Sequence, residues 1–220
     1  LNYMKALVIL SIFMGFYTKG YTQTINGTII HDGIVRTYKL YVPAIYSGNV
    51  PVPLLLNFHG YTSNSNEQMF YGDFRNIADT ANFLVVHPQG TLDNTNTTHF
   101  NVGWGGSTVD DVGFTEALID SLSAVYSIDQ NRIYAVGMSN GGFMSFRLAC
   151  DLSAKIAAVG SVTGSMTPST LVNCNASHPM PIIQIHGTTD ATVPYIGSTG
   201  WTAPVANVLN HWATFNNCSP

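Results

Sequence analysis

A serine between two glycines is the first group in this chain whose surroundings could support covalent chemistry. Ser139 lies in the segment Gly137-Met138-Ser139-Asn140-Gly141, which follows a short apolar run and precedes a helical pattern over residues 143–150. A strand, a tight turn and a helix in this order expose a serine hydroxyl and direct the free N–H groups of the helix start at a developing oxyanion. Ser139 is therefore our candidate nucleophile. The alternative is a glycine-rich turn with an idle serine.

Two other polar segments also follow apolar runs. His59-Gly60-Tyr61 comes after the run 54–58, and the segment from His186 to Asp190 comes after a run that begins at residue 182. In a parallel sheet, function gathers where the strands end. Asp190 lies downstream of the serine, where an aspartate that orients a catalytic imidazole is needed. We predict that Asp190 is this acid; its alternative role is a turn or cap aspartate.

The elements that must position these groups alternate between strand and helix. Residues 25–30 and 34–42 alternate polar and apolar side chains around His31-Asp32-Gly33, which predicts a hairpin. The elements expected after it are strand 54–58, helix 67–81, strand 83–87, helix 110–126, the strand into the serine turn, the helix after it, strands 156–161 and 182–186, and helix 205–216. This order predicts an α/β fold on a mostly parallel sheet.

The composition is poor in charge. Charged residues make up 9% of the 220 residues and the net charge is −4, whereas about 25% charged residues is usual. Such a surface has no basic footprint for nucleic acid or for an anionic membrane. We therefore expect a neutral substrate as the partner and no nucleic acid. We also expect a monomeric protein.

The N-terminal segment has the pattern of a secretory signal peptide. Met4-Lys5 precedes the apolar run 6–16, which is too short to span a bilayer, and a polar stretch follows. We predict residues 1–22 as the signal peptide, with a cut between Gly20 and Thr24, and residues 23–220 as one domain. The alternative is an anchor or buried helix. The mature protein is expected to be secreted, extracellular or periplasmic, with no membrane attachment.

Three segments together resemble a known family. They are Gly137–Gly142, the segment Val109–Phe114 before it, and His186–Tyr195 after it. Their residues and their order along the chain are similar to those of the secreted polyhydroxybutyrate depolymerase and feruloyl esterase family. The members of this family are carbohydrate-esterase-type serine esterases with the α/β-hydrolase fold. The resemblance extends over residues 34–218.

The resemblance implies a set of roles. It implies serine-esterase chemistry through an acyl-enzyme, with Ser139 as the nucleophile and Asp190 as the acid. It also implies that the backbone N–H groups of Tyr61 and Asn140 form the oxyanion hole. No metal or organic cofactor is required for this chemistry.

The histidine of the triad has no clear candidate. In this family it follows the last core strand, and no strand-like run follows residues 182–186. His211 is in a helical pattern beside Trp212, which favours a packed or surface histidine, and His59 and His186 fit structural roles in their turns. We therefore expect a C-terminally incomplete α/β-hydrolase fold whose catalytic histidine lies beyond Pro220.

The three cysteines leave one unpaired in an exported chain. Cys150, at the end of the helix after Ser139, and Cys174, before the strand that leads to Asp190, are the predicted disulfide. Cys218 would then pair with a cysteine beyond Pro220. The alternative is a disulfide between Cys218 and one of the other two cysteines.

The sequence indicates the substrate less clearly than the reaction. Residues 91–108 form a long polar loop that carries Trp104, and long loops in compact domains are often functional. Trp104 and Trp201 could stack on a sugar or a phenolic acyl group, or pack in the core. We expect feruloyl or acetyl esters on plant polysaccharide. The alternatives are a polyhydroxybutyrate depolymerase, a peptidase or thioesterase, and a non-catalytic ligand-binding homologue.

Overall fold

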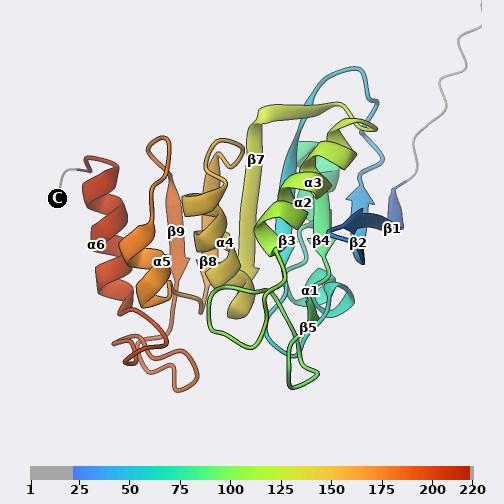
Figure 1. Cartoon of the computed structure of the whole chain (residues 1–220). Helices are drawn as coiled ribbons and strands as arrows, with labels where there is room; N and C mark the ends of the chain where they lie inside the picture. The colour runs from blue at the N-terminus through green and yellow to red at the C-terminus, as the bar shows by residue number, and fades with distance from the viewer. Residues whose placement is uncertain (1–21, 219–220) are drawn as a thin grey trace, which may run out of the picture.

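A computed structural model describes residues 22–218 (Figure 1). The predicted signal peptide therefore lies outside the described residues, except for Thr22. A seven-stranded sheet in the order β1-β2-β4-β3-β7-β8-β9 forms the centre. Its strands are β1 (Gln23–His31), β2 (Ile34–Val42), β3 (Val52–Phe58), β4 (Leu84–Pro88), β7 (Ile128–Met138), β8 (Ala158–Val162) and β9 (Ile182–Ile185). A separate two-stranded sheet contains β5 (Thr91–Leu92) and β6 (Thr98–His99).

The first two strands form the predicted hairpin. β1 pairs antiparallel with β2, and β2 pairs antiparallel with β4. Asp32 and Gly33 have φ of 49° and 75°, which is the backbone of the two-residue turn that matches strand twist. The pairs from β4 through β3, β7 and β8 to β9 are all parallel. The predicted mostly parallel sheet is confirmed.

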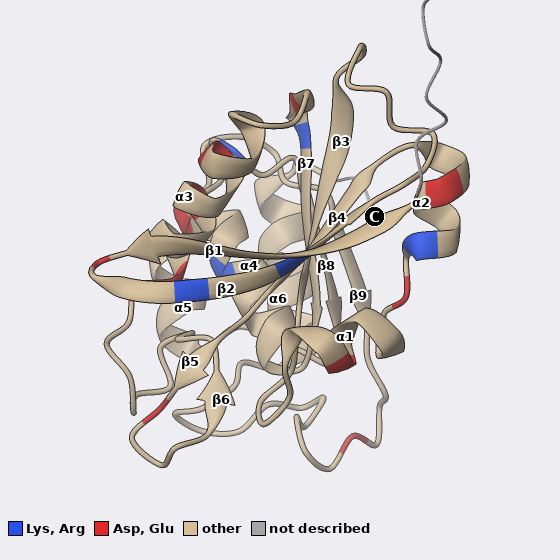
Figure 2. Ribbon diagram, turned by 90° about the vertical axis from the view of Figure 1, so that its right-hand side faces the viewer, with Lys and Arg blue, Asp and Glu red and all other residues tan. Residues whose placement is uncertain are grey.

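Helices cover both faces of this sheet, and α2 and α3 lie on opposite sides in Figure 2. The helices are α1 (Ser65–Tyr71), α2 (Arg75–Ala81), α3 (Asp111–Ser123), α4 (Asn140–Asp151), α5 (Pro168–Asn173) and α6 (Val205–Phe215). On β3, Leu54 and Leu56 belong to the large core cluster that includes α3, α4 and α6, whereas Leu55 packs with Ala78 of α2. Successive side chains of a strand point to opposite faces, so burial on both sides requires a continuous apolar run.

Several element boundaries differ from the prediction. The expected helix over residues 67–81 is two helices, because Gly72 ends α1 and the Asp73 carboxylate accepts a hydrogen bond from the N–H of Arg75 at the start of α2. The helix expected over 110–126 extends over 111–123: Asp110 caps its start by accepting from Gly113 N–H, and Ala124 is its C-cap. The helix α5 and the β5–β6 hairpin were missed because both are very short.

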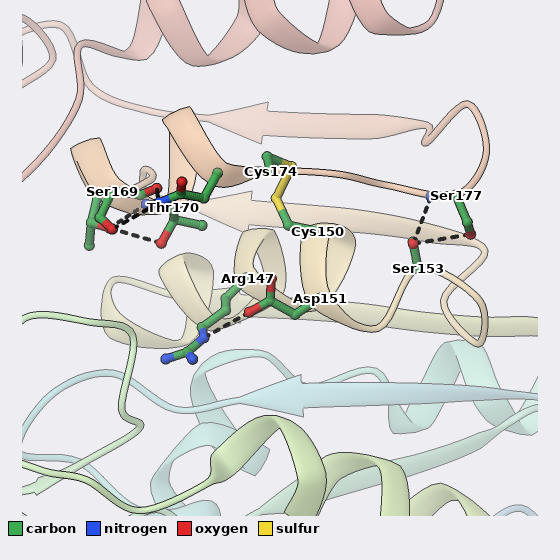
Figure 3. The surroundings of a disulfide bond; sticks show 10 residues. Arg147, Cys150, Asp151, Ser153, Ser169, Thr170, Cys174 and Ser177 are labelled. Atoms are coloured by element: carbon green, nitrogen blue, oxygen red, sulfur yellow. Dashed lines mark hydrogen bonds and ion pairs between the residues drawn. A yellow bond between two sulfur atoms is a disulfide. The ribbon is translucent and has the colours of Figure 1, made fainter.

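The predicted disulfide between Cys150 and Cys174 is present (Figure 3). It links the end of α4 to the residue that ends α5. Cys218 is exposed and forms no disulfide within residues 22–218. The segment between α5 and β9 is further held to the chain after α4, because Ser153 Oγ accepts from the N–H of Ser177.

The surface agrees with the low charge of the sequence. In Figure 2 the Lys, Arg, Asp and Glu residues are scattered over the ribbon. Within residues 22–218, no helix combines the length and the apolar character that crossing a membrane would need.

Candidate active site

Ser139 lies in a strained turn between β7 and α4. Its backbone has φ 52° and ψ −118°, a region that non-glycine residues rarely occupy and that concentrates at functional sites. The turn is tight enough to need its glycines. A Cβ on Gly137 would lie 2.4 Å from the backbone of Gly141, and a Cβ on Gly141 would lie 2.1 Å from the carbonyl oxygen of Phe58. This is the geometry that a nucleophile elbow requires.

Two backbone donors lie in the segments that flank the serine. Asn140 is the first residue of α4, where an N–H has no acceptor within the helix. The turn after β3 lies against the elbow, because a Cβ on Gly60 would be 3.5 Å from the Cβ of Ser139. The next N–H, that of Tyr61, donates no hydrogen bond to any residue from 22 to 218. Both groups predicted for the oxyanion hole are thus available as donors.

His59 holds the turn that carries Tyr61. Its Nδ1–H donates to the carbonyl of Gly60 at 2.8 Å, and its Nε2 accepts from the N–H of Gly90 at 3.0 Å. The ring is fully buried and lies 4.6 Å from the ring of Phe100. Burial lowers the pKa of His59 to about 4, so the ring is neutral at pH 7. These contacts give His59 a structural role.

His59 and His87 should make the protein sensitive to mild acid. Burial lowers the pKa of each from 6.5 to about 4. The unfolded chain therefore binds more protons than the folded chain below pH 6.5, and stability falls as the pH drops from about 6.5 to about 4. Each histidine should cost roughly 2 kcal/mol between pH 7 and pH 5. Urea unfolding at the two pH values measures this loss.

His87 offers the cleaner variant, because both of its ring nitrogens are buried without a hydrogen-bond partner among the described residues. The change His87→Leu should remove about half of the pH-dependent loss. An unchanged pH dependence in that variant would show that His87 does not titrate in this range.

Asp190 lies in the loop after β9. Its Oδ1 accepts hydrogen bonds from the N–H groups of Thr192 and Val193, at 2.8 and 2.9 Å. The bond from Val193 N–H is the main cause that lowers the pKa of Asp190, so this carboxylate is charged at neutral pH. Within residues 22–218 its Oδ2 accepts no hydrogen bond, and Thr192 and Val193 line the same cavity as Ser139. The carboxylate keeps one oxygen free to accept from an imidazole.

None of the histidines in residues 22–218 is hydrogen-bonded to the hydroxyl of Ser139. His186 Nε2 is 3.6 Å from the Oδ2 of Asp190, but it lies 2.8 Å from the carbonyl of Val193, to which it donates. Gln184 Nε2 lies 2.9 Å from its Nδ1, so both ring nitrogens are used. His211 lies in α6 and stacks on Phe215 at 6.4 Å.

A cavity of about 460 Å³ opens beside Ser139. It is lined by Tyr61, Asp93, Asn94, His99, Trp104, Gly105, Gly106, Ser139, Thr192, Val193 and Trp201. Trp104 and Trp201 lie 6.0 Å apart, and Trp104 also contacts Phe143 at 4.9 Å. Both tryptophans that were singled out in the sequence thus pack on the protein with one side and line the cavity with another. An aromatic cavity of this kind can hold a planar apolar group.

Asp93 is a cavity residue that the sequence reasoning missed. Its Oδ2 accepts from the hydroxyl of Tyr61 at 2.8 Å, and its Oδ1 accepts from Thr95 and from the N–H of Thr97. The hydrogen bond from the Thr95 side chain is the largest cause that holds its pKa far below the usual range. The Asp-Asn-Thr-Asn-Thr run, typical of an Asx turn, was the available signal. Asp93 fixes Tyr61 and places a negative charge in the cavity.

One group of potential metal ligands occurs in the described part of the chain. His31, Asp32 and Asp110 bring their ligand atoms within 4.8 Å of one another. The two aspartates are exposed, and none of the three lines the Ser139 cavity. We assign no metal to this group.

Comparison with known proteins identifies the family. The model of the phospholipase/carboxylesterase family matches residues 43–213, which include the elbow and the loop of Asp190. The chain belongs to this family. Among curated proteins, it is 31% identical over 178 residues to a bifunctional acetylxylan esterase/xylanase of Neocallimastix patriciarum, covering 79% of this chain and 24% of that protein. It is 28% identical over 202 residues to a probable feruloyl esterase C of Aspergillus flavus, which covers 88% of this chain and 66% of that protein.

Solved structures agree with an α/β-hydrolase fold. A thermostable esterase aligns with a TM-score of 0.67 at 19% identity, over 88% of this chain and 52% of that chain. An S-formylglutathione hydrolase from Agrobacterium tumefaciens aligns with a TM-score of 0.66 at 15% identity, over 90% of this chain and 84% of that chain. The predicted α/β-hydrolase fold is confirmed. The chain spans between about a quarter and two thirds of the length of the curated relatives it matches first.

Proposed function

We propose that this protein is a serine esterase. The observation that carries the proposal is the strained elbow at Ser139, which opens into an aromatic cavity and is flanked by the free N–H groups of Tyr61 and Asn140. Strain at a single non-glycine residue costs about 1–3 kcal/mol and persists where function uses it. A chain that only bound a ligand would have no need of this cost.

In the proposed reaction the Ser139 hydroxyl attacks the ester carbonyl and gives its proton to the catalytic base. The ester C–O bond then breaks, the alcohol leaves with that proton, and an acyl-enzyme remains. The negative charge that develops on the carbonyl oxygen is stabilised by the two N–H donors. Water then releases the acid and restores the serine. A histidine accepts and returns the proton, and we propose that this histidine lies outside residues 22–218 and that the free Oδ2 of Asp190 orients it.

The proposed substrates are feruloyl or acetyl esters carried by plant polysaccharide. The names of the relatives, acetylxylan esterase and feruloyl esterase, support this class. The planar walls of Trp104 and Trp201 favour an aromatic acyl group. We also propose that the protein is exported, since its disulfide is typical of an oxidising compartment.

Hydrolysis of methyl ferulate, an acetyl ester and short hydroxybutyrate oligomers by the complete protein would test the substrate class. We expect Trp104→Ala to raise the KM for methyl ferulate by about tenfold, which corresponds to about 1.4 kcal/mol of lost binding. The KM for the acetyl ester should change little, because a methyl group leaves most of the cavity empty.

Phe70→Ala is a matched control for loss of an aromatic ring, since Phe70 is exposed on α1 and lines no part of this cavity. Equal losses on ferulate and acetate in the Trp104 variant would argue against an aromatic acyl site. Faster turnover of the hydroxybutyrate oligomers would favour the depolymerase alternative.

A further inference from the structure

The side chain of Asn140 makes a two-point contact with a distant part of the chain. Its Oδ1 accepts the N–H of Phe100 at 2.7 Å, and its Nδ2 donates to the carbonyl of Phe100 at 3.0 Å. Asn140 and Phe100 are both 0% exposed. One side-chain amide thus satisfies both backbone polar groups of a buried residue 40 positions away, next to the nucleophile.

The segment around Phe100 connects the parts of the site. The Phe100 ring meets Phe58, the last residue of β3, edge-on at 5.1 Å. Two residues earlier, the carbonyl of Thr98 accepts the N–H of Thr62, which directly follows the proposed oxyanion donor of Tyr61. Four residues later, Trp104 packs on Phe143 of α4 and lines the cavity. The Asn140 amide therefore lies where the elbow, the turn after β3 and the aromatic wall meet.

We propose that the Asn140 side chain is a positioning residue that holds the loop 91–108 against the elbow. Through this contact it keeps Trp104 in place as the acyl wall and fixes the peptide whose N–H faces the oxyanion. The proposal rests on the esterase function given above. The role needs an amide, because a neighbouring N–H and C=O require one acceptor and one donor from the same side chain.

Two replacements separate the parts of this contact. Asn140→Asp keeps the size and the acceptor but removes the Nδ2 donor and turns a carboxylate oxygen toward the carbonyl of Phe100. Asn140→Ala leaves both groups of Phe100 buried and unpaired. Ser145→Ala is the matched control: Ser145 is buried in the same helix and donates a hydrogen bond to Gly141 C=O at 2.9 Å, but it makes no hydrogen bond to the loop.

The decisive measurement is the steady-state kinetics of the complete protein and its variants. Fluorophosphonate labelling of Ser139 gives the concentration of intact sites. We expect both Asn140 variants to lower kcat for methyl ferulate and for the acetyl ester at least tenfold, and to raise KM at least fivefold for methyl ferulate alone. Ser145→Ala should remain within twofold of wild type on both. A purely structural Asn140 would lower the number of labelled sites and leave kcat and KM per site unchanged.

Amide hydrogen exchange without substrate provides a second readout. The amides of residues 98–106 should exchange faster in both Asn140 variants and at the wild-type rate in Ser145→Ala. Unchanged exchange together with unchanged kinetics would overturn the positioning role and leave the esterase intact. If the complete wild-type protein, with its catalytic histidine, hydrolysed no ester, the proposed function would fail and the exchange result alone would decide whether Asn140 positions the loop.

Discussion

Replacing Ser139 by alanine in the complete protein should abolish ester hydrolysis and leave the fold unchanged. The hydroxyl is the proposed nucleophile, and loss of the nucleophile in serine hydrolases lowers kcat on the order of 10⁶-fold. Stability should change little, because the Cβ of alanine fits the same turn. An unchanged melting temperature in Ser139→Ala would show that the surrounding backbone, and not the hydroxyl, holds the φ of 52°. Initial rates with methyl ferulate and an acetyl ester, beside a thermal melt, measure both.

Fluorophosphonate labelling gives the matching chemical test. The probe should modify the wild-type chain at Ser139 and leave Ser139→Ala unmodified. Ser161, whose hydroxyl is buried without a hydrogen-bond partner among the described residues, is the control serine, and Ser161→Ala should label like wild type. Hydrolysis retained in Ser139→Ala would mean that another group attacks the ester.

The largest effect on stability is expected at a buried ion pair. Arg36 of β2 donates from Nη2 to Asp111 Oδ1 at 2.5 Å, and both side chains are almost fully buried. The guanidinium also covers the ring of Phe114 at 3.8 Å, and Asp111 Oδ2 accepts the N–H of Asn101 at 2.7 Å. Removing one partner leaves an uncompensated buried charge, so Arg36→Met should lower the free energy of unfolding by about 3–5 kcal/mol.

The double variant Arg36→Met, Asp111→Leu distinguishes the pair from general packing. With neither charge present, most of the lost stability should return, because apolar replacement of a buried pair is often neutral. Urea unfolding of the two single variants and the double variant gives the coupling. A loss below about 1 kcal/mol in Arg36→Met would show that water reaches the pair and that it is not buried in solution.

Features encoded within a few neighbouring residues were predictable. The glycines around Ser139, the Asp-Gly turn of the first hairpin and the apolar run of β3 each reflect a local backbone or burial requirement. Single residues also explain why some predicted helix boundaries differ from the observed ones. Gly72 is the C-cap of α1, and the Asp73 carboxylate accepts the N–H of Arg75 at the start of α2, so two neighbouring residues divide one expected helix.

What the sequence by itself determined is the nucleophile turn, the alternation of strand and helix, and through them the fold class. Only the tertiary structure decided which distant side chains meet: Arg36 with Asp111, 75 positions apart, and Asn140 with Phe100, 40 positions apart. The structure also showed that both ring nitrogens of His186 are hydrogen-bonded, to Gln184 and to the carbonyl of Val193. Local order follows from the short-range sterics and burial of a few residues. Contacts between distant segments depend on how the sheet orders its strands and on which loops then share one edge, and no short stretch of sequence specifies that.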